Sequence, residues 1–365
     1  MLPVKTPTLL LDKEKCQNNI RQMAMKAAKN KIELIPHFKT HQSLQVGEWF
    51  RRAGVEAITV TSMNMARYFA SGGWKDITVA MPVNVREADE INELAARVSL
   101  HLFINNKETL NLLNKQLTRP IRFSIEIDAG YRRSGVPANN KAAIRSILDA
   151  SVKSLLNFEG FYSHAGHTYE VQSIEEVHRI YRQTATELNA LKEVFQPQYP
   201  GVKLSLGDTP SCSLVDDFTG IDNIRPGNFV FYDLKQLSVG SNTIDQIALC
   251  LAVPVLEKHT DRGEVVAHSG WAHLGKDSLR DKDGTLHYGK VVQLTETGWA
   301  LPGPGAYVSQ VSQEHGILKL PGSLLQQIEV GDTLGVLPVH ACATALMMGE
   351  LRTLEGTSIF TMQEY

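Results

Sequence analysis

Apolar positions in the first two thirds of the chain alternate between short runs and longer stretches with a helical period. The short runs predict strands at residues 8–12, 32–35, 57–60, 77–80, 99–104, 122–127, 158–162, 203–206 and 228–232. Apolar residues that recur every three or four positions predict helices at residues 13–29, 46–52, 64–71, 85–94, 107–115, 141–148 and 173–194. Repeated strand-then-helix units predict a parallel sheet covered by helices. About eight strands between residues 32 and 232 favour a closed (β/α)8 barrel over an open sheet.

The pattern changes after about residue 240. Apolar runs at residues 247–253 and 291–294 are separated by turns rich in Gly and Pro, and long helical patterns are absent. This predicts a smaller C-terminal all-β domain. The expected division is a barrel over residues 6–240 and a β domain over residues 241–365 that also takes in residues 1–5.

Composition excludes several classes of function. The net charge of −2 comes from 37 basic and 39 acidic side chains, so no strong field attracts nucleic acid or an anionic membrane. No apolar run approaches the length of a membrane span, and the N-terminus lacks the pattern of a signal peptide. The four cysteines, Cys16, Cys212, Cys250 and Cys342, are widely spaced and form no paired framework. We therefore expect a cytoplasmic protein that binds neither nucleic acid nor membrane.

Lys39 is the first candidate for chemistry. It follows the apolar run 32–35, with His37 two residues before it and His41 two residues after it. If the strand continues, its alternation places the three side chains on one face. Lysine forms imines with carbonyl compounds when its amine can lose its proton, and burial beside other cations lowers its pKa. Taken alone, the segment still favours an exposed lysine at the end of a strand.

Further polar clusters fall at predicted strand ends, where barrel enzymes place their active sites. Residues 128–136 carry Arg133 beside two glycines, a combination suited to carboxylate, phosphate or phenolate oxygen; a turn with solvated arginines fits equally well. Residues 162–169 carry His164 and His167. The glycine between these two histidines indicates a loop, so a substrate or cofactor role is preferred to a metal site, with a structural role left open.

Two glycine turns and one histidine–cysteine pair complete the candidates. The turns at residues 206–211 and 225–228 suit a phosphate held by backbone N–H groups and hydroxyls, although each is also compatible with a plain turn. His340 and Cys342 stand two apart and would point the same way on an extended strand. Imidazole with thiolate favours zinc and leaves positions for water and substrate; the alternative is a buried free cysteine.

Together these segments resemble the D-serine dehydratase and D-threonine aldolase family of pyridoxal-phosphate enzymes, which has the alanine-racemase fold (fold type III). The resemblance covers nearly the whole chain, at residues 6–8, 36–41, 130–136, 162–169, 207–211, 225–233 and 340–342. It implies that Lys39 is the Schiff-base lysine and that Tyr169 faces the pyridine nitrogen. The other cofactor residues that it implies are Arg133 near the ring oxygen and, around the phosphate, Gly207, Thr209, Gly227, Asn228 and Tyr232.

His340 and Cys342 match the metal pair of the family. Dehydratase-type members carry His-x-Cys with zinc, whereas aldolase-type members carry His-x-Asp, so zinc is expected here, with Mn²⁺ or another divalent ion as the alternative. The resemblance also implies a homodimer. His268 and Gly275 depart from the family, which usually has aspartate and serine at these positions, and no role is assigned to His268, His273 or His315.

The leading hypothesis is a zinc-assisted lyase that converts D-serine to pyruvate and ammonia, with Lys39 removing the α-proton. The alternative within enzymes is a D-threonine or D-3-hydroxy amino acid aldolase that gives glycine and an aldehyde, with His164 or His167 as the base. The alternative outside enzymes is a non-catalytic carrier of pyridoxal phosphate.

Overall fold

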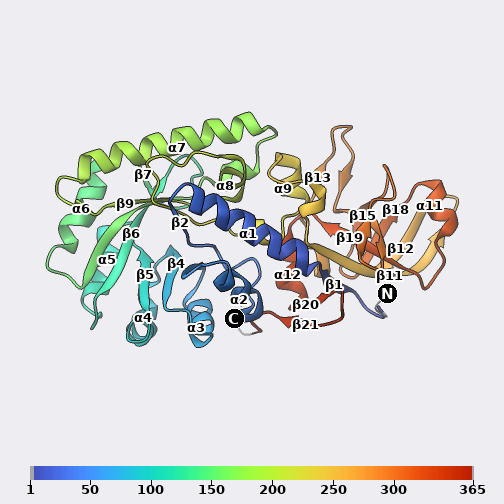
Figure 1. Cartoon of the computed structure of the whole chain (residues 1–365), viewed down its shortest axis with the longest axis horizontal. Helices are drawn as coiled ribbons and strands as arrows, with labels where there is room; N and C mark the ends of the chain where they lie inside the picture. Colours follow the sequence, from blue (N-terminus) through green and yellow to red (C-terminus); the bar gives the residue numbers. More distant parts are fainter. Residues whose placement is uncertain (1–3, 364–365) are drawn as a thin grey trace.

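The computed structural model describes residues 4–363, which form two parts side by side along the long axis of the molecule (Figure 1). The N-terminal part carries a parallel sheet with its helices, and the C-terminal part is built mainly of antiparallel strands. The helix α1 (Lys13–Lys29) runs along the side of the molecule where the two parts meet.

The parallel sheet curls into a barrel. Its strands in spatial order are β2 (Glu33–Leu34), β10 (Asn223–Ile224), β9 (Lys203–Leu206), β8 (Leu156–Ser163), β6 (Ile121–Asp128), β5 (Ser99–Phe103), β4 (Asp76–Pro82) and β3 (Ala57–Val60). The short strand β7 (Val136–Pro137) pairs with β6. His37 bridges to Thr59 of β3, and the Phe38 N–H donates to the Thr59 carbonyl at 2.8 Å, so the ring closes beside Lys39. The predicted barrel is confirmed.

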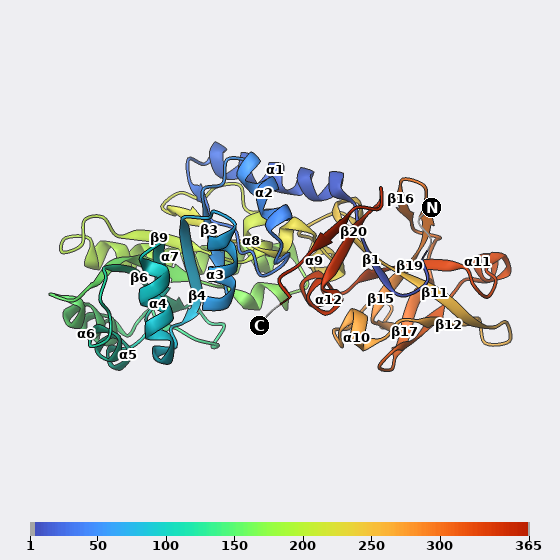
Figure 2. The same ribbon diagram turned by 90° about the horizontal axis from the view of Figure 1, so that it is seen from below.

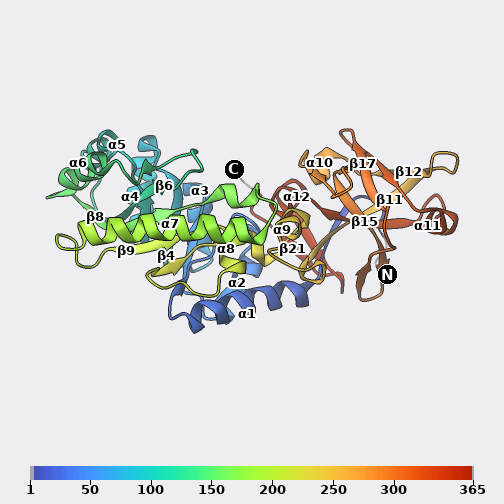
Figure 3. The same cartoon turned by 90° about the horizontal axis from the view of Figure 1, so that it is seen from above.

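Helices cover this barrel. They are α1, α2 (Leu44–Arg52), α3 (Met63–Ser71), α4 (Ala88–Ala95), α5 (Lys107–Asn114), α6 (Lys141–Ser151), α7 (Ile174–Phe195), α8 (Thr209–Leu214) and α9 (Leu234–Val239), with 3₁₀ turns η1 (Val85–Glu87), η2 (Gly166–Tyr169), η3 (Asn228–Val230) and η4 (Ile244–Gln246). Figure 2 shows α3 and α4 beside β3 and β4, and Figure 3 shows α7 lying along the barrel, where it contacts β8 and β9. Ser173 begins α7 by accepting the Glu176 N–H, and a buried stripe from Val177 to Phe195 faces the sheet.

The second sheet also closes on itself. Its ring consists of β12 (Glu264–His268), β18 (His315–Lys319), β17 (Tyr307–Val311), β15 (Gly289–Thr295), β19 (Thr333–Pro338) and β11 (Leu249–His259), which pairs back with β12. From β11 the sheet continues through β1 (Thr8–Leu11), β20 (Glu350–Thr353) and β21 (Ser358–Phe360). The remaining elements of this part are β16 (Gly298–Ala300), β13 (Leu279–Arg280), β14 (Leu286–His287), α10 (Trp271–Leu274), α11 (Gly322–Gln327) and α12 (Ala341–Met348). The predicted C-terminal β domain is confirmed.

The N-terminal strand β1 belongs to this second sheet, because it pairs with β11 and β20. The expected division assigned residues 1–5 to the β domain; the structure adds Thr8–Leu11 to that sheet. Residues 1–3 and 364–365, which the expected division also assigned to the β domain, lie outside the described part of the chain. None of the helices within residues 4–363 combines the length and the apolar composition that crossing a bilayer requires.

Two local predictions in the barrel are wrong. Residues 228–232 do not form a strand: η3 starts there, and the last strand of the barrel is β10. Phe229, Val230 and Phe231 are all fully buried, and a short run of buried apolar residues fits a buried helical turn as well as a strand.

The second wrong prediction is the continuation of the strand through Lys39. Strand β2 ends at Leu34, and Lys39 lies in a turn over residues 38–41. Pro36 has no N–H with which to extend the ladder. The side chain of His41 is buried and stacks on Phe50 at 5.6 Å between ring centroids, whereas Lys39 points into a cavity. The three side chains of this segment therefore do not share one face.

Candidate active site

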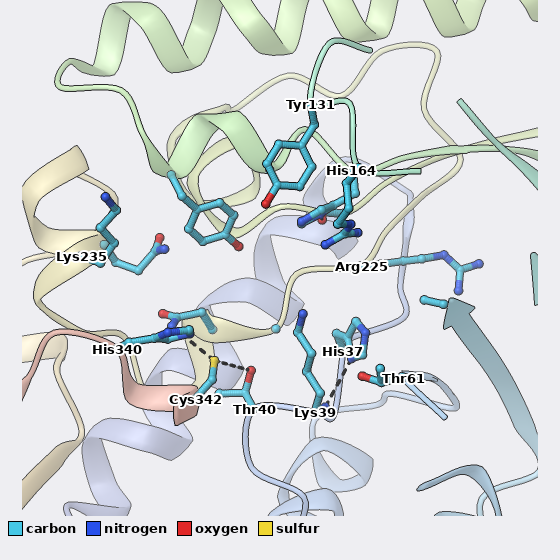
Figure 4. A pocket seen from close by; sticks show the side chains of 18 of the residues that line it. His37, Lys39, Thr40, Thr61, Tyr131, His164, Arg225, Lys235, His340 and Cys342 are labelled. Atoms are coloured by element: carbon cyan, nitrogen blue, oxygen red, sulfur yellow. Dashed lines mark hydrogen bonds between the residues drawn. The ribbon is translucent and has the colours of Figure 1, made fainter. Parts of the chain in front are cut away.

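A cavity of about 890 Å³ opens at the carboxyl ends of the barrel strands and faces the β domain (Figure 4). Both parts of the molecule line it, which is the expected place for the active site of a barrel enzyme. The predicted site residues that line it are Lys39, Arg133, His164, Tyr169, Gly207, Gly227, Asn228, His340 and Cys342.

Three predicted site residues lie near the cavity without lining it. Thr209 is buried behind Tyr169, whose hydroxyl accepts its N–H at 3.1 Å. Tyr232 is buried, with its hydroxyl 3.1 Å from Oγ of Ser213. His167 stacks on Tyr131 with ring centroids 6.3 Å apart. Of the two predicted histidines, only His164 reaches the cavity.

Lys39 extends into the cavity between His340 and Cys342 on one side and His37 on the other (Figure 4). Lys39 is still accessible to the solvent in the cavity, but the protein atoms around its amine exclude part of that water and lower its pKa; Cys342 opposes this effect, and the positive charge of Arg133 adds to it. Nδ1 of His37 accepts the backbone N–H of Lys39 at 3.3 Å. Burial holds the pKa of His37 well below the usual range. A neutral histidine therefore adjoins an amine that loses its proton easily, as imine formation requires.

The two glycine turns meet beside this lysine. A Cβ at position 227 would lie 2.9 Å from the His37 carbonyl oxygen and 3.1 Å from Oγ1 of Thr40, so the close approach requires glycine. Within residues 4–363, the buried Oγ1 of Thr209 and Oγ of Ser211 make no hydrogen bond of good geometry, although Tyr169 and Asp208 lie close to them. Buried hydroxyls without a good hydrogen bond are costly, so these two fit a ligand that is rich in oxygen, such as phosphate.

His164 and Tyr169 are neutral groups on the wall of the cavity. Burial lowers the pKa of His164 to about 3, and its Nδ1 contacts the carbonyl oxygen of Gly207. Nδ1 therefore carries the proton, and Nε2 remains as an acceptor. Burial raises the pKa of Tyr169 well above its usual range, so its hydroxyl keeps its proton.

His340 and Cys342 lie at the start of α12, and the predicted extended geometry for this pair is wrong. His340 is the N-cap residue and Cys342 is in the first helical turn, but the two side chains still interact. Burial raises the pKa of Cys342, but the hydrogen bond and charge of His340 outweigh that effect and lower it overall. The thiol is therefore inclined to ionise, and a thiolate is the form that binds metal.

The pair meets the barrel next to Lys39. Sγ of Cys342 lies 3.3 Å from Oγ1 of Thr40 and 3.6 Å from Nδ2 of Asn228. Oδ2 of Asp233 accepts the Asn228 amide at 2.6 Å and the Ala341 N–H at 2.9 Å. Within residues 4–363, no group of three or more His, Cys, Asp or Glu side chains is arranged to hold a metal, so this pair would supply two ligands and leave room for water or substrate.

Several residues with a clear place in the site were not predicted. Asp233 and Asp277 both line the cavity, and Asp277 lies 3.1 Å from Nδ1 of His340. Arg225 also lines it, with its guanidinium donating to hydroxyls of the barrel interior such as that of Thr78 at 2.7 Å. Asp233 is the last residue of the segment 225–233, which carries the family resemblance. Its contact with the N–H of Ala341 could not be predicted, because the two residues are far apart in the sequence.

The other histidines of the β domain are not among the cavity residues. His268 lies 3.6 Å from a carboxylate oxygen of Glu314, and its ring centroid is 5.7 Å from that of His273. His315 is the partner of His268 across β12 and β18.

Residues 11–235 match the family described as "Alanine racemase, N-terminal domain", and residues 248–354 match the "Putative serine dehydratase domain". The D-threo-3-hydroxyaspartate dehydratase of Delftia sp. (strain HT23) is 27% identical over 356 residues, covering 94% of this chain and 92% of the relative. Its solved structure has a TM-score of 0.92 at 24% identity and covers 99% of this chain and 98% of that one. A D-threo-3-hydroxyaspartate dehydratase has also been solved as a cysteine-to-alanine mutant in a metal-free form.

The D-serine dehydratase of Dictyostelium discoideum is 24% identical over 380 residues, covering 97% of this chain and 94% of the relative. The D-threonine aldolase of Arthrobacter sp. is 22% identical over 355 residues, covering 93% and 86%. Dehydratases and aldolases of this kind are lyases, so the predicted family and enzyme class are confirmed. The chain belongs to the alanine racemase N-terminal-domain family and, with its C-terminal serine dehydratase domain, to the D-serine dehydratase and D-threonine aldolase group within it.

Proposed function

We propose that this chain is a pyridoxal-phosphate-dependent, zinc-assisted dehydratase that converts D-serine to pyruvate and ammonia. The single observation that carries the proposal is the contact between Cys342 and Thr40, because it brings the histidine–cysteine pair of one domain beside the reactive lysine of the other. A carrier that performs no chemistry needs no such pair.

When bound, pyridoxal phosphate would withdraw electrons from the α-carbon of the substrate, and zinc would act as a Lewis acid toward the leaving oxygen. The residues that would hold the cofactor are Lys39 at its carbonyl carbon, Arg133 at the ring oxygen, Tyr169 at the ring nitrogen, and Gly207, Thr209, Gly227, Asn228 and Tyr232 around the phosphate. The buried hydroxyls of Thr209 and Ser211, which make no hydrogen bond of good geometry within residues 4–363, support the phosphate assignment. His340 and Cys342 would hold the metal, zinc being preferred to Mn²⁺ because the thiolate is a soft ligand.

Lys39 is the group that moves the proton. Once the substrate amine has replaced Lys39 at the carbonyl carbon of the cofactor, the lowered pKa of Lys39 would let the freed, neutral amine take the α-proton onto Nζ. The Cβ–O bond then breaks, and the leaving hydroxide takes the proton from Nζ of Lys39 and departs as water. The remaining aminoacrylate tautomerises and is hydrolysed, which gives pyruvate and ammonia.

One observation favours the aldolase as a second candidate. His164 is neutral, lines the cavity and has Nε2 available as an acceptor, so it could take the proton of a β-hydroxyl while the Cα–Cβ bond breaks. His167 does not line the cavity, so of the two histidines His164 is the better candidate for this base.

A panel of D-3-hydroxy amino acids, assayed with and without a metal chelator, tests the proposal. We expect keto acid and ammonia from D-serine, at least a tenfold loss of rate with chelator, recovery on adding zinc, and no turnover by Lys39→Ala. Glycine and an aldehyde as the main products would establish the aldolase instead. Full turnover by Lys39→Ala would rule out both assignments.

We also propose that the chain acts as a homodimer in the cytoplasm. Leu346 and Met347 on α12 are each 46% exposed, although α12 is apolar on nearly every face, and Phe360 on β21 is 57% exposed. Both α12 and β21 contact β20, and large exposed apolar side chains that gather around one strand indicate a contact surface. All four cysteines are free thiols, which supports a reducing compartment; subcellular fractionation would test the location.

A further inference from the structure

We infer that Asp277 is a positioning residue for the proposed metal site: it holds Nδ1 of His340 and leaves Nε2 as the nitrogen that binds the ion. The inference rests on the proposed function, since it concerns the residues that would hold the metal. Its evidence is the way in which the two members of the pair are held.

The thiol and the backbone of the pair are held from the barrel side. Sγ of Cys342 contacts Thr40 at 3.3 Å and Asn228 at 3.6 Å. The N–H of Ala341, which lies between the two ligands, donates to the fully buried Asp233 at 2.9 Å. These contacts fix the start of α12 and the position of the sulfur.

The imidazole of His340 is held from the other side, by the β domain. Its Nδ1 lies 3.1 Å from Oδ2 of Asp277, and the two side chains are 45% and 52% exposed. The ring also contacts Cys342, and Asp277 is the partner that holds Nδ1 and so fixes which nitrogen carries the proton. Histidine ligands of metals almost always donate the second ring N–H to a carboxylate, carbonyl or water, which sets the tautomer and the ring orientation.

The loop that presents Asp277 is itself held against α12. Helix α10 precedes this loop and packs on α12, where Oγ1 of Thr344 lies 3.4 Å from the Leu274 carbonyl oxygen. Gly275 then adopts φ +81°, a left-handed conformation that favours glycine, and it directs the chain toward His340. The glycine that stands in place of the family's usual serine thus serves the turn that delivers this carboxylate.

Loss of this partner should weaken zinc binding by 10- to 100-fold, the range found when the outer partner of a metal-binding histidine is removed. Asp277→Asn should fall between the wild type and Asp277→Ala, because an amide oxygen still accepts the Nδ1 proton but carries no charge. Bound pyridoxal phosphate should be unaffected, since the residues proposed to hold the cofactor do not include Asp277.

The experiment measures zinc affinity of the protein loaded with pyridoxal phosphate, by competition with a chromophoric chelator and without substrate. Wild type, Asp277→Ala, Asp277→Asn and Asp283→Ala are compared. Asp283 is a matched control because it is an exposed aspartate nearby in sequence whose carboxylate is held by the neighbouring Thr285, which donates its N–H at 2.9 Å. The zinc concentration for half-maximal activity gives a second readout, and the maximal rate at saturating zinc should stay close to that of wild type.

Equal zinc affinity in wild type, Asp277→Ala and Asp277→Asn, with cofactor absorbance retained, would overturn the inference. A lower maximal rate at saturating zinc with unchanged zinc affinity would also overturn it. If wild type binds no zinc and chelator leaves its activity intact, the proposed metal site fails, and the inference fails with it. If Asp277→Ala loses its cofactor absorbance, the near-isosteric Asp277→Asn decides the question.

Discussion

The carboxyl group of Asp208 is fully buried just behind the cavity, at the start of α8. Its Oδ1 accepts the Ser211 N–H at 2.8 Å and the Thr168 hydroxyl at 2.9 Å, while its Oδ2 has no partner within residues 4–363. Burial raises the pKa of Asp208 to about 6, against these hydrogen bonds, which lower it. Ionisation of this group therefore costs more in the folded than in the unfolded protein.

This shift predicts how stability depends on pH. The pKa of Asp208 is higher in the folded protein than in the unfolded chain, so the unfolded chain ionises first as pH rises. The stabilising contribution of Asp208 is therefore fully present below the unfolded pKa and is lost as pH rises through about 6. The free energy of unfolding of wild type, measured against Asp208→Asn, should fall by up to about 3 kcal/mol between about pH 4 and pH 8. Urea unfolding of both proteins across this range provides the measurement. A constant difference, or one that grows with pH, would contradict the assigned shift.

At the scale of elements, two turns carry the site, and each depends on the other. The turn at residues 38–41 presents Lys39, and Gly227 packs against it just before η3. A methyl group at position 227 would meet the His37 carbonyl oxygen at 2.9 Å, which is closer than real Cβ atoms approach backbone. One of the two turns must then shift.

Gly227→Ala should therefore lose about 1–3 kcal/mol of stability through overpacking and bind pyridoxal phosphate at least tenfold more weakly. Thermal unfolding and titration of cofactor absorbance measure the two effects. Gly201→Ala is the matched control, because a Cβ there meets no atom within 4 Å, and its change should stay within about 0.5 kcal/mol. An equal response of the two variants would show that the close approach at Gly227 does not matter.

Regular elements were the easiest to predict from sequence. The helix at residues 13–29 has the bounds of α1, and the strand at residues 203–206 has those of β9, because each carries a clear apolar period and defined ends. The errors fall at residues 36–41, 228–232 and 340–342, where the chain makes turns around the cavity. Such segments are shaped by contacts with distant parts of the chain, which override local preference.

At the scale of the whole molecule, the cavity needs both domains. The exposed apolar side chains of α12 and β21 belong to the β domain, where α12 contacts β20 and β20 pairs with β21. If this surface joins two copies of the chain, a charge placed on it should separate them. The double variant Leu346→Glu with Met347→Glu should elute as a monomer in size-exclusion chromatography with light scattering, where wild type elutes as a dimer. Val330→Glu is the control, because Val330 is 61% exposed but lies outside these elements. A wild-type monomer, or a dimer that survives the double substitution, would contradict the proposed contact.

The sequence by itself determined most of the strands and helices of the barrel, the change to a β domain and the likeness to a family of pyridoxal-phosphate enzymes, because apolar periods and short motifs are local properties. It also singled out Lys39, but only when the downstream glycine turns and the histidine–cysteine pair are read together with it. Only the tertiary structure decided which residues meet that lysine. The contact of Thr40 with Cys342 joins positions 302 residues apart, and the approach of Asp277 to His340 depends on how α10 packs on α12. These contacts form when two domains bury a shared face, which no local pattern encodes.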